Sequence, residues 1–135
     1  MDHVVISGAG VFAIETKYIG KPKQGKGELV YDVEAVRLGA VELFNDGIKQ
    51  AKGCALSVAK TLKQLGEEQS VRAVVIFPGY YVKGKPASPD GVWAQNENYF
   101  VRRVAEAENK PLTALDVERI YAKLCARLEQ PRTLS

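Results

Sequence analysis

The amino-acid sequence predicts an α/β fold with a mixed central β-sheet flanked by helices. Short runs of β-branched and aromatic residues bounded by glycine or proline occur near the start of the chain and at 71–77, as is typical of strands. Longer segments with apolar residues at a 3.6-residue spacing lie between and after these runs, as is typical of amphipathic helices. A length of 135 residues suits one hydrophobic core, so we expect a single domain over residues 1–135.

Composition limits the classes of function. The chain is 46% hydrophobic and 26% charged, and no apolar run approaches the roughly 18 residues that span a bilayer, so we expect a cytoplasmic protein with no membrane partner. Cys54 and Cys125 fall within apolar helical patterns, which favours small buried side chains over a disulfide or a metal pair. The net charge of +3 permits a nucleic-acid partner. A run of four lysines could contact phosphates: Lys17, Lys21, Lys23 and Lys26.

The first two strands are predicted from the stretch at 4–17, which has two interpretations. Gly8 and Gly10 match the G-x-G-x-x-A pattern of a dinucleotide-binding loop, and such a loop needs a helix directly after it. The residues that follow are mostly β-branched and aromatic, and a later glycine and proline close the segment, so a helix is not favoured. We therefore predict a β-hairpin that joins a strand at 2–6 to a strand at 11–17 through a glycine turn.

The middle of the chain is expected to add a third strand, a helix and a buried strand. Residues 28–38 are assigned to the third strand, although their periodicity is mixed. Asp46 is a suitable N-cap for the helix, and Gly66 can end it. The buried strand at 71–77 would end at the proline and glycine that follow it. The helix is supported by an apolar stripe at helical spacing: Ile48, Ala51, Ala55, Val58, Leu62 and Leu65.

A polar loop with two prolines and two glycines is expected at 83–91. Aromatic side chains flank it at Tyr80, Tyr81 and Trp93. Aromatic residues beside lysines can form a platform on which bases stack, but in and next to short strands they more often belong to the core. Both interpretations stay open at this point.

The last elements are a short strand at 92–94, a helix at 97–107 and a final helix. Thr113 and Asp116 have the spacing that caps the start of this final helix. Its inward positions are predicted to be Val117, Ile120, Leu124 and Leu128.

A candidate site follows from the geometry of the hairpin. Because alternate side chains of a strand share a face, Glu15 and Lys17 point to the same side. Asp2 lies at the outer end of the antiparallel partner, so two carboxylates and an ammonium group would meet at one rim of the sheet. Carboxylates can hold Mg²⁺, which lowers the pKa of an attacking water, and a lysine can stabilise charge on a phosphate. The pattern suits phosphodiester hydrolysis, although an exposed Glu-x-Lys is also a common surface pair.

Four stretches carry a resemblance to a known family. They are "DHVVISGAGVFAIETKYIG", "NDGIKQAKGCA", "VRAVVIFPGYYV" and "PLTALDVERIYAKLCARL". In content and order they resemble the nuclease-related domain (NERD) family, which is related to the PD-(D/E)xK superfamily, and they extend over most of the chain. The resemblance implies a restriction-endonuclease-like core and a metal-dependent nuclease, or a descendant of one, that acts on DNA.

Position by position, the resemblance implies that Asp2 and Glu15 bind Mg²⁺ or Mn²⁺ and that Lys17 is the catalytic lysine. It also implies that Gln50 completes the catalytic set from the following helix. Gln50 lies about 100° from Ala51 around that helix, so it could reach the rim of the sheet while the apolar stripe packs.

Two features depart from the family pattern. The helix with an acidic residue that normally precedes the first strand has no counterpart before Asp2, and the usual Asn-Pro dipeptide is replaced by Asn45-Asp46. The sheet face that this helix would cover must then be shielded by the C-terminal helices or by another subunit, and on that ground we expect a homo-oligomer, most simply a homodimer whose partner copy covers this face. The leading function is metal-dependent hydrolysis of DNA. One alternative is a degenerate NERD module that binds nucleic acid or a protein without cleaving, and another is nucleotide binding through Gly8 and Gly10.

Overall fold

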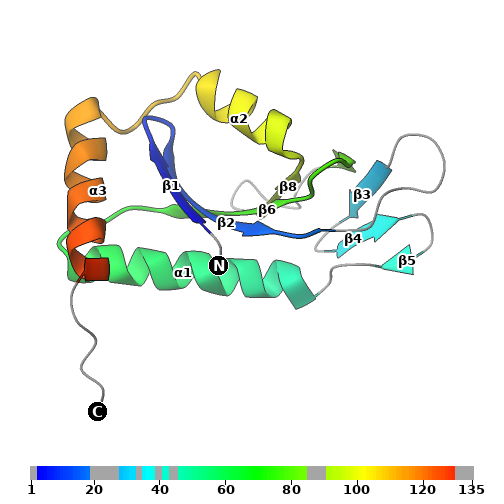
Figure 1. Ribbon diagram of the computed structural model, residues 1–135, viewed down its shortest axis with the longest axis horizontal. Helices are drawn as coiled ribbons and strands as arrows, with labels where there is room; N and C mark the ends of the chain where they lie inside the picture. Colours follow the sequence, from blue (N-terminus) through cyan, green and yellow to red (C-terminus); the bar gives the residue numbers. More distant parts are fainter. Residues whose placement is uncertain are drawn as a thin grey trace, which may run out of the picture.

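The computed structural model confirms an α/β fold with a mixed sheet between helices (Figure 1). It describes the backbone of residues 3–18, 28–32, 35–38, 41–42, 46–84 and 91–129, and the side chains of most of these residues. The strands of this described part are β1 (His3–Ser7), β2 (Gly10–Thr16), β3 (Glu28–Asp32), β4 (Ala35–Leu38), β5 (Val41–Glu42), β6 (Val71–Ile76), β7 (Tyr81–Gly84) and β8 (Trp93–Gln95). Its helices are α1 (Asp46–Gln64), α2 (Glu97–Ala105) and α3 (Ala114–Glu129).

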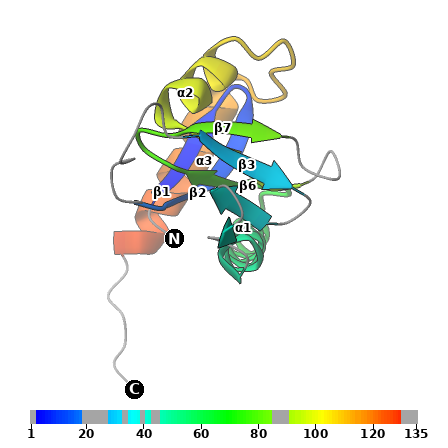
Figure 2. The ribbon, with the colours of Figure 1, turned by 90° about the vertical axis from the view of Figure 1, so that its right-hand side faces the viewer.

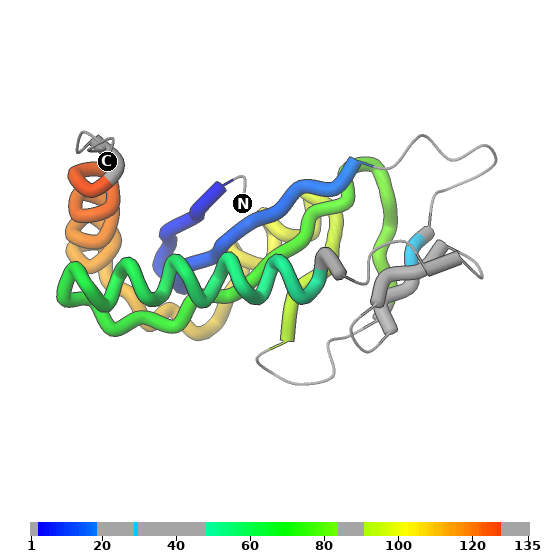
Figure 3. The backbone as a smooth tube through the Cα atoms, turned by 90° about the horizontal axis from the view of Figure 1, so that it is seen from below, coloured from blue at the N-terminus to red at the C-terminus, as the bar shows by residue number. Residues whose placement is uncertain are grey.

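The strands form two four-stranded sheets. The central sheet has the order β1-β2-β6-β8, in which β1 is antiparallel to β2 and the other pairs are parallel. The second sheet has the order β5-β4-β3-β7. Helix α1 runs along one face of the central sheet, α2 covers the other face, and α3 stands at one end (Figures 1 and 3). The second sheet lies at the opposite end, and β3 and β7 are in front of the central sheet when that end is viewed directly (Figure 2).

The predicted hairpin is confirmed. The strands β1 and β2 pair antiparallel, from Ser7 opposite Gly10 to His3 opposite Ile14. Gly10 has a φ of +138°, a value that glycine adopts without strain. Because the residues after the turn form a strand rather than a helix, they offer no helix N-terminus to a dinucleotide, and this structure does not support nucleotide binding through the glycines.

The prediction of a third strand at 28–38 is wrong in two ways. These residues include two strands, β3 and β4, which pair antiparallel with Tyr31 opposite Val36, and both belong to the second sheet. Strand β3 also pairs in parallel with β7, with Leu29 opposite Val82. Leu29 is fully buried against the main core, so this strand helps to join the second sheet to the rest of the domain.

The predicted helices are confirmed, with α2 ending two residues earlier than expected. Helix α1 ends as predicted at Gly66, which has a φ of +83°, and the backbone N–H of Glu67 donates to the carbonyl of Leu62 across the end of the helix at 2.8 Å. At the start of α3 the backbone N–H of Asp116 donates to Thr113 Oγ1 at 3.1 Å, and the N–H of Thr113 donates to Asp116 Oδ2 at 2.8 Å. This is the predicted reciprocal cap.

The core divides at the central sheet. One cluster joins the sheet face that bears Val11 and Ala13 to the apolar stripe of α1 and to Ile120 of α3. The other cluster joins Phe12 to Phe100 of α2. The alternation of β2 is therefore complete, because its odd-numbered residues face α1 and its even-numbered residues face α2.

An ion-pair network fastens α3 to the end of α1. The buried carboxylate of Glu67 accepts hydrogen bonds from Arg119 Nε at 2.6 Å and from Lys123 Nζ at 3.0 Å. These two hydrogen bonds, the one from Arg119 first, hold the pKa of the Glu67 carboxyl below its usual 4.5.

The aromatic residues beside the polar loop do not share one environment. Tyr80 is buried in the core, Tyr81 is exposed and Trp93 is half-buried.

Within the described chain Cys54 and Cys125 are free thiols, and they are half-buried rather than fully buried. The described helices include none with the length and apolar character needed to cross a membrane.

Some sequence predictions fall outside the described residues. The loop at 83–91 begins within β7, and its residues 85–90 are not described. The same holds for Asp2, for the side chain of Leu128, and for the lysines at 21, 23 and 26.

Candidate active site

The parallel strands β2, β6 and β8 end at the same edge of the central sheet. Their pairing places Glu15, Val75 and Ala94 in one row across the sheet. The next row consists of Thr16, Ile76 and Gln95. The carboxyl edge of parallel strands is the usual position of ligand sites in α/β sheets. In this protein the edge faces the second sheet (Figures 1 and 2).

Glu15 stands on the α1 side of this edge. It follows the buried residues Val11 and Ala13 on the same face of β2, and it is half-buried where the apolar stripe gives way to polar residues. The thiol of Cys54 on α1 donates a hydrogen bond to Glu15 Oε1, with a sulfur–oxygen distance of 3.6 Å. The side of α1 that carries Cys54 therefore borders the carboxylate.

Lys17 follows one residue after the end of β2. Its backbone N–H donates to the carbonyl of Ile76 at 2.8 Å, which continues the ladder between β2 and β6 beyond Thr16. By alternation Lys17 then belongs to the same face as Glu15, and its side chain is exposed. A carboxylate and an ammonium group thus occupy neighbouring positions on one face, as the sequence predicts.

Gln50 lies on α1 one turn before Cys54 and is exposed. Residues four apart share one side of a helix, so Gln50 and Cys54 lie on the same side of α1. The contact of Cys54 with Glu15 therefore places Gln50 near the sheet rim without showing a bond between them. Sequence reasoning missed Cys54 as a neighbour of the site, although its spacing from Gln50 was a usable signal.

Among the described residues this edge offers one hard oxygen donor and one soft sulfur donor. Glu15 supplies a hard carboxylate oxygen, whereas Cys54 is a soft ligand that Mg²⁺ and Mn²⁺ do not favour. Among the described residues no group of three histidine, cysteine, aspartate or glutamate side chains could enclose a metal. Mg²⁺ usually keeps several waters and takes one or two carboxylates, so such a group is not required. The second carboxylate expected from the sequence, Asp2, is outside the described residues.

The opposite face of the sheet carries arginines. Arg103 of α2 stacks on the ring of Trp93, with its guanidinium carbon 3.5 Å from the ring centroid, and Arg72 of β6 lies at 5.0 Å. Burial lowers the pKa of Arg103, but a guanidinium group remains charged at neutral pH. Trp93 is therefore a platform for arginines, and positive charge collects on the α2 face.

These features define an α/β domain with a carboxylate and a lysine at the carboxyl edge of its mixed sheet. The family model described as the nuclease-related domain, NERD, matches residues 1–78, which is more than half of the 135-residue chain. The chain therefore belongs to the NERD family. The match includes Asp2, Glu15, Lys17 and Gln50. The curated proteins and the solved structures gave no match to this chain.

Proposed function

We propose that this NERD domain hydrolyses phosphodiester bonds of DNA with the help of Mg²⁺ or Mn²⁺. The observation that supports this most is the pairing of Glu15 and Lys17 on one face at the end of β2, within the segment that the family model matches. Asp2 and Glu15 would hold the ion. When bound, it would orient the scissile phosphate and lower the pKa of a water molecule.

The residues of the chain have separate roles in this proposal. The half-buried Glu15 is fixed by β2 on one side and by α1 on the other, so its carboxylate is held in position before a substrate arrives. Lys17 is exposed, and its ammonium group would stabilise the transition state on the phosphate. Gln50 would support the site from α1.

The experiment is a cleavage assay with single- and double-stranded DNA in the presence of Mg²⁺, Mn²⁺ or EDTA. Glu15→Gln and Lys17→Ala are expected to lose activity, and the wild type is expected to lose it in EDTA. The matched controls are Glu68→Gln and Lys60→Ala. Glu68 is exposed just before β6, at the opposite edge of the sheet, and Lys60 is exposed on α1. Activity that survives in Glu15→Gln would refute the proposal.

A second candidate function is a module that binds nucleic acid or a protein without cleaving it. The hydrogen bond from the Cys54 thiol to Glu15 favours it, because this bond engages one of the two carboxylate oxygens that would hold the ion. A folded wild type that binds DNA but cleaves none under any metal condition would support this second candidate.

A further inference from the structure

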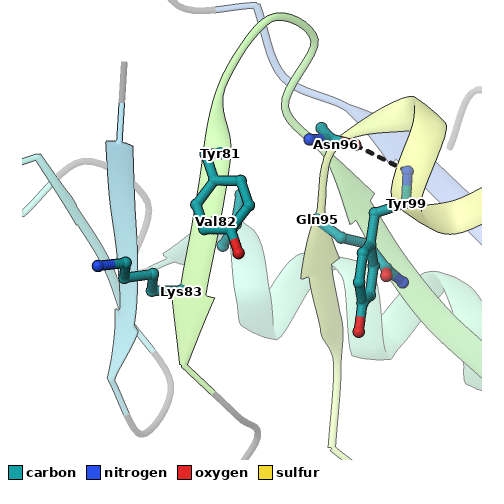
Figure 4. Close-up of a pocket in the computed structure, with 6 residues that line it drawn as sticks. All are labelled: Tyr81, Val82, Lys83, Gln95, Asn96 and Tyr99. Carbon is teal, nitrogen blue, oxygen red and sulfur yellow. Dashed lines mark hydrogen bonds between the residues drawn. The ribbon is translucent and has the colours of Figure 1, made fainter. Parts of the chain in front are cut away.

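A pocket lies beside the carboxyl edge of the central sheet, between the two sheets. It has a volume of about 250 Å³ and is lined by residues of β7, β8 and α2: Tyr81, Val82, Lys83, Gln95, Asn96 and Tyr99 (Figure 4). Pockets for drug-sized ligands begin at roughly 300 Å³, so this one suits a single ring system. The ligand-binding residues implied by the family resemblance do not include any of these side chains.

Gln95 is the unusual residue of this pocket. It is 3% exposed, yet both its amide nitrogen and its amide oxygen lack a hydrogen-bond partner among the described residues. Buried polar groups are nearly always paired, because an unpaired one costs free energy. The amide of Gln95 therefore offers a buried donor and a buried acceptor side by side, and a ligand with a complementary acceptor and donor could bind both.

Two tyrosines stand on either side of the pocket. In Figure 4 the side chain of Gln95 extends from β8 to the side on which Tyr99 lies, whereas the ring of Tyr81 lies beside β7. Tyr81 and Tyr99 are 57% and 51% exposed, so neither ring is packed into the core. The backbone N–H of Tyr99 is held by Asn96 Oδ1 at 2.8 Å, and its exposed ring can change rotamer beside Gln95.

The chain positions these groups by local rules. Phe77 to Tyr80 form a turn closed by the Tyr80 N–H and the Phe77 carbonyl at 3.2 Å, and Gly79 takes a φ of +79° in it. This turn takes the chain out of the central sheet and into β7, so that Tyr81 comes to face β8. Asn96 caps the start of α2 and thereby places Tyr99 in the first turn of the helix.

We propose that this pocket binds an unpaired nucleobase, with the Gln95 amide on the edge of the base and Tyr81 and Tyr99 against its faces. Every nucleobase offers a donor and an acceptor next to each other on one edge, which an amide can bind with two hydrogen bonds. In a duplex the Watson–Crick edges are paired and the faces of each base are stacked on its neighbours, so a base with Tyr81 and Tyr99 against its faces comes from a single strand or a free nucleotide. The choice of a nucleobase over other planar amides rests on the proposed function.

The surroundings of the pocket fit a nucleic-acid strand. Trp93 precedes Gln95 by two residues on the same face of β8, so the guanidinium of Arg103 on its ring is within roughly 7 Å along the strand. Gln95 and Thr16 belong to one row with β6 between them, which separates β8 from β2 by roughly 10 Å. Gln95 lies on the α2 face and Glu15 on the α1 face, so a nucleic-acid strand that passes over the carboxyl edge from one face to the other could place one base in the pocket and a phosphate near Glu15.

The test measures binding in EDTA, so that cleavage plays no part. A fluorescein-labelled 12-nucleotide oligo(dA) is titrated with protein, and its anisotropy is followed. Gln95→Met, which keeps the length of the side chain, is expected to weaken binding by roughly 5- to 150-fold, the range for a bidentate amide–base contact. Tyr99→Ala is expected to weaken binding over a similar range, since it removes a stacking ring. Gln64→Met and Tyr121→Ala, exposed on α1 and α3 at the far end of the sheet, are the matched controls.

The competitors distinguish the two sources of a base. Unlabelled oligo(dA) should displace the probe, whereas its duplex with oligo(dT) should not. Displacement by free dAMP at a similar concentration would assign the pocket to a mononucleotide, and a requirement for oligo(dA) would assign it to single-stranded DNA. Unchanged affinity in Gln95→Met, or an equal loss in Gln64→Met, would overturn the proposal. Cleavage by the wild type with unchanged binding by Gln95→Met would refute the pocket alone, and binding lost in Gln95→Met without any cleavage would refute the nuclease alone.

Discussion

Replacement of Gln95 by methionine is predicted to stabilise the fold while it weakens the binding of a base. In the ligand-free protein the amide of Gln95 is buried without a partner among the described residues, and such a group costs about 1–3 kcal/mol. Methionine has a similar length and no polar hydrogen to bury, and it fills irregular spaces well. Because the pocket is open on one side, we take the lower part of that range, a gain of about 1–2 kcal/mol.

The assay is thermal unfolding followed by circular dichroism, without DNA. For a domain of this size each kcal/mol shifts Tm by roughly 3–4 °C, so Gln95→Met should melt about 3–8 °C above the wild type. The exposed Gln64→Met should stay within about 0.5 kcal/mol of the wild type. A lower Tm for Gln95→Met would mean that the amide is hydrogen-bonded in the native protein. The argument that this amide is available to bind a ligand would then fail.

The remaining predictions concern stability, metal and assembly. Glu67→Gln should lose about 1–2 kcal/mol at pH 7, below the value for a fully buried pair because the partners of Glu67 are partly exposed. Since the folded pKa of Glu67 is lowered, its contribution is complete above the unfolded pKa and is lost as pH falls through the folded pKa, so urea midpoints of wild type and variant should converge below pH 4.5. Mn²⁺ should raise the Tm of the wild type but not of Glu15→Ala, and equal shifts would remove the ion from this site. Gly79→Ala should cost about 1–2 kcal/mol in urea unfolding, because an added Cβ meets no atom within 4 Å but takes a φ of +79°. Because α1 and α2 cover the two faces of the central sheet, the homodimer expected from the sequence would have to use another surface; sedimentation at micromolar concentration should show it, and a monomer would contradict that expectation.

The elements that the sequence predicts correctly are those whose signals are local. The hairpin turn depends on two glycines with one residue between them, and α1 ends at Gly66 through bonds to residues within the last turn. The cap of α3 joins Thr113 to Asp116, three residues apart. A short window of sequence contains all the groups that make each of these contacts, so the pattern alone is sufficient.

The second sheet could not be predicted because its pairing is not local. Strand β3 pairs with β7, so that Leu29 lies opposite Val82, and neither segment shows a clean alternation by itself. The mixed periodicity of 28–38 reflects two short strands, β3 and β4, that pair with each other, whereas the sequence pattern treats them as one strand. Burial of Leu29 comes from the distant core rather than from its neighbours in sequence.

The same distinction applies to the sites. Alternation along β2 is enough to place Glu15 and Lys17 on one face, so the sequence predicts that pair. The contact between Cys54 and Glu15 depends on how α1 lies across the sheet, which no short pattern encodes. In the sequence, Gln95 directly follows the strand predicted at 92–94 and resembles an ordinary polar residue at the end of a strand. Its burial arises because β7 and α2 approach it from two sides, and only the folded chain reveals its unused amide.

The most direct test of the central claim is the rate of DNA cleavage in Mn²⁺ by the wild type, Glu15→Gln and Glu68→Gln, with all three confirmed as folded by their melting curves. The account predicts cleavage by the wild type and by Glu68→Gln, and a loss of at least a hundredfold in Glu15→Gln, the order expected when a group that acts in the transition state is removed. Equal rates in the wild type and Glu15→Gln would contradict it, because the carboxylate at the end of β2 would then have no part in the reaction.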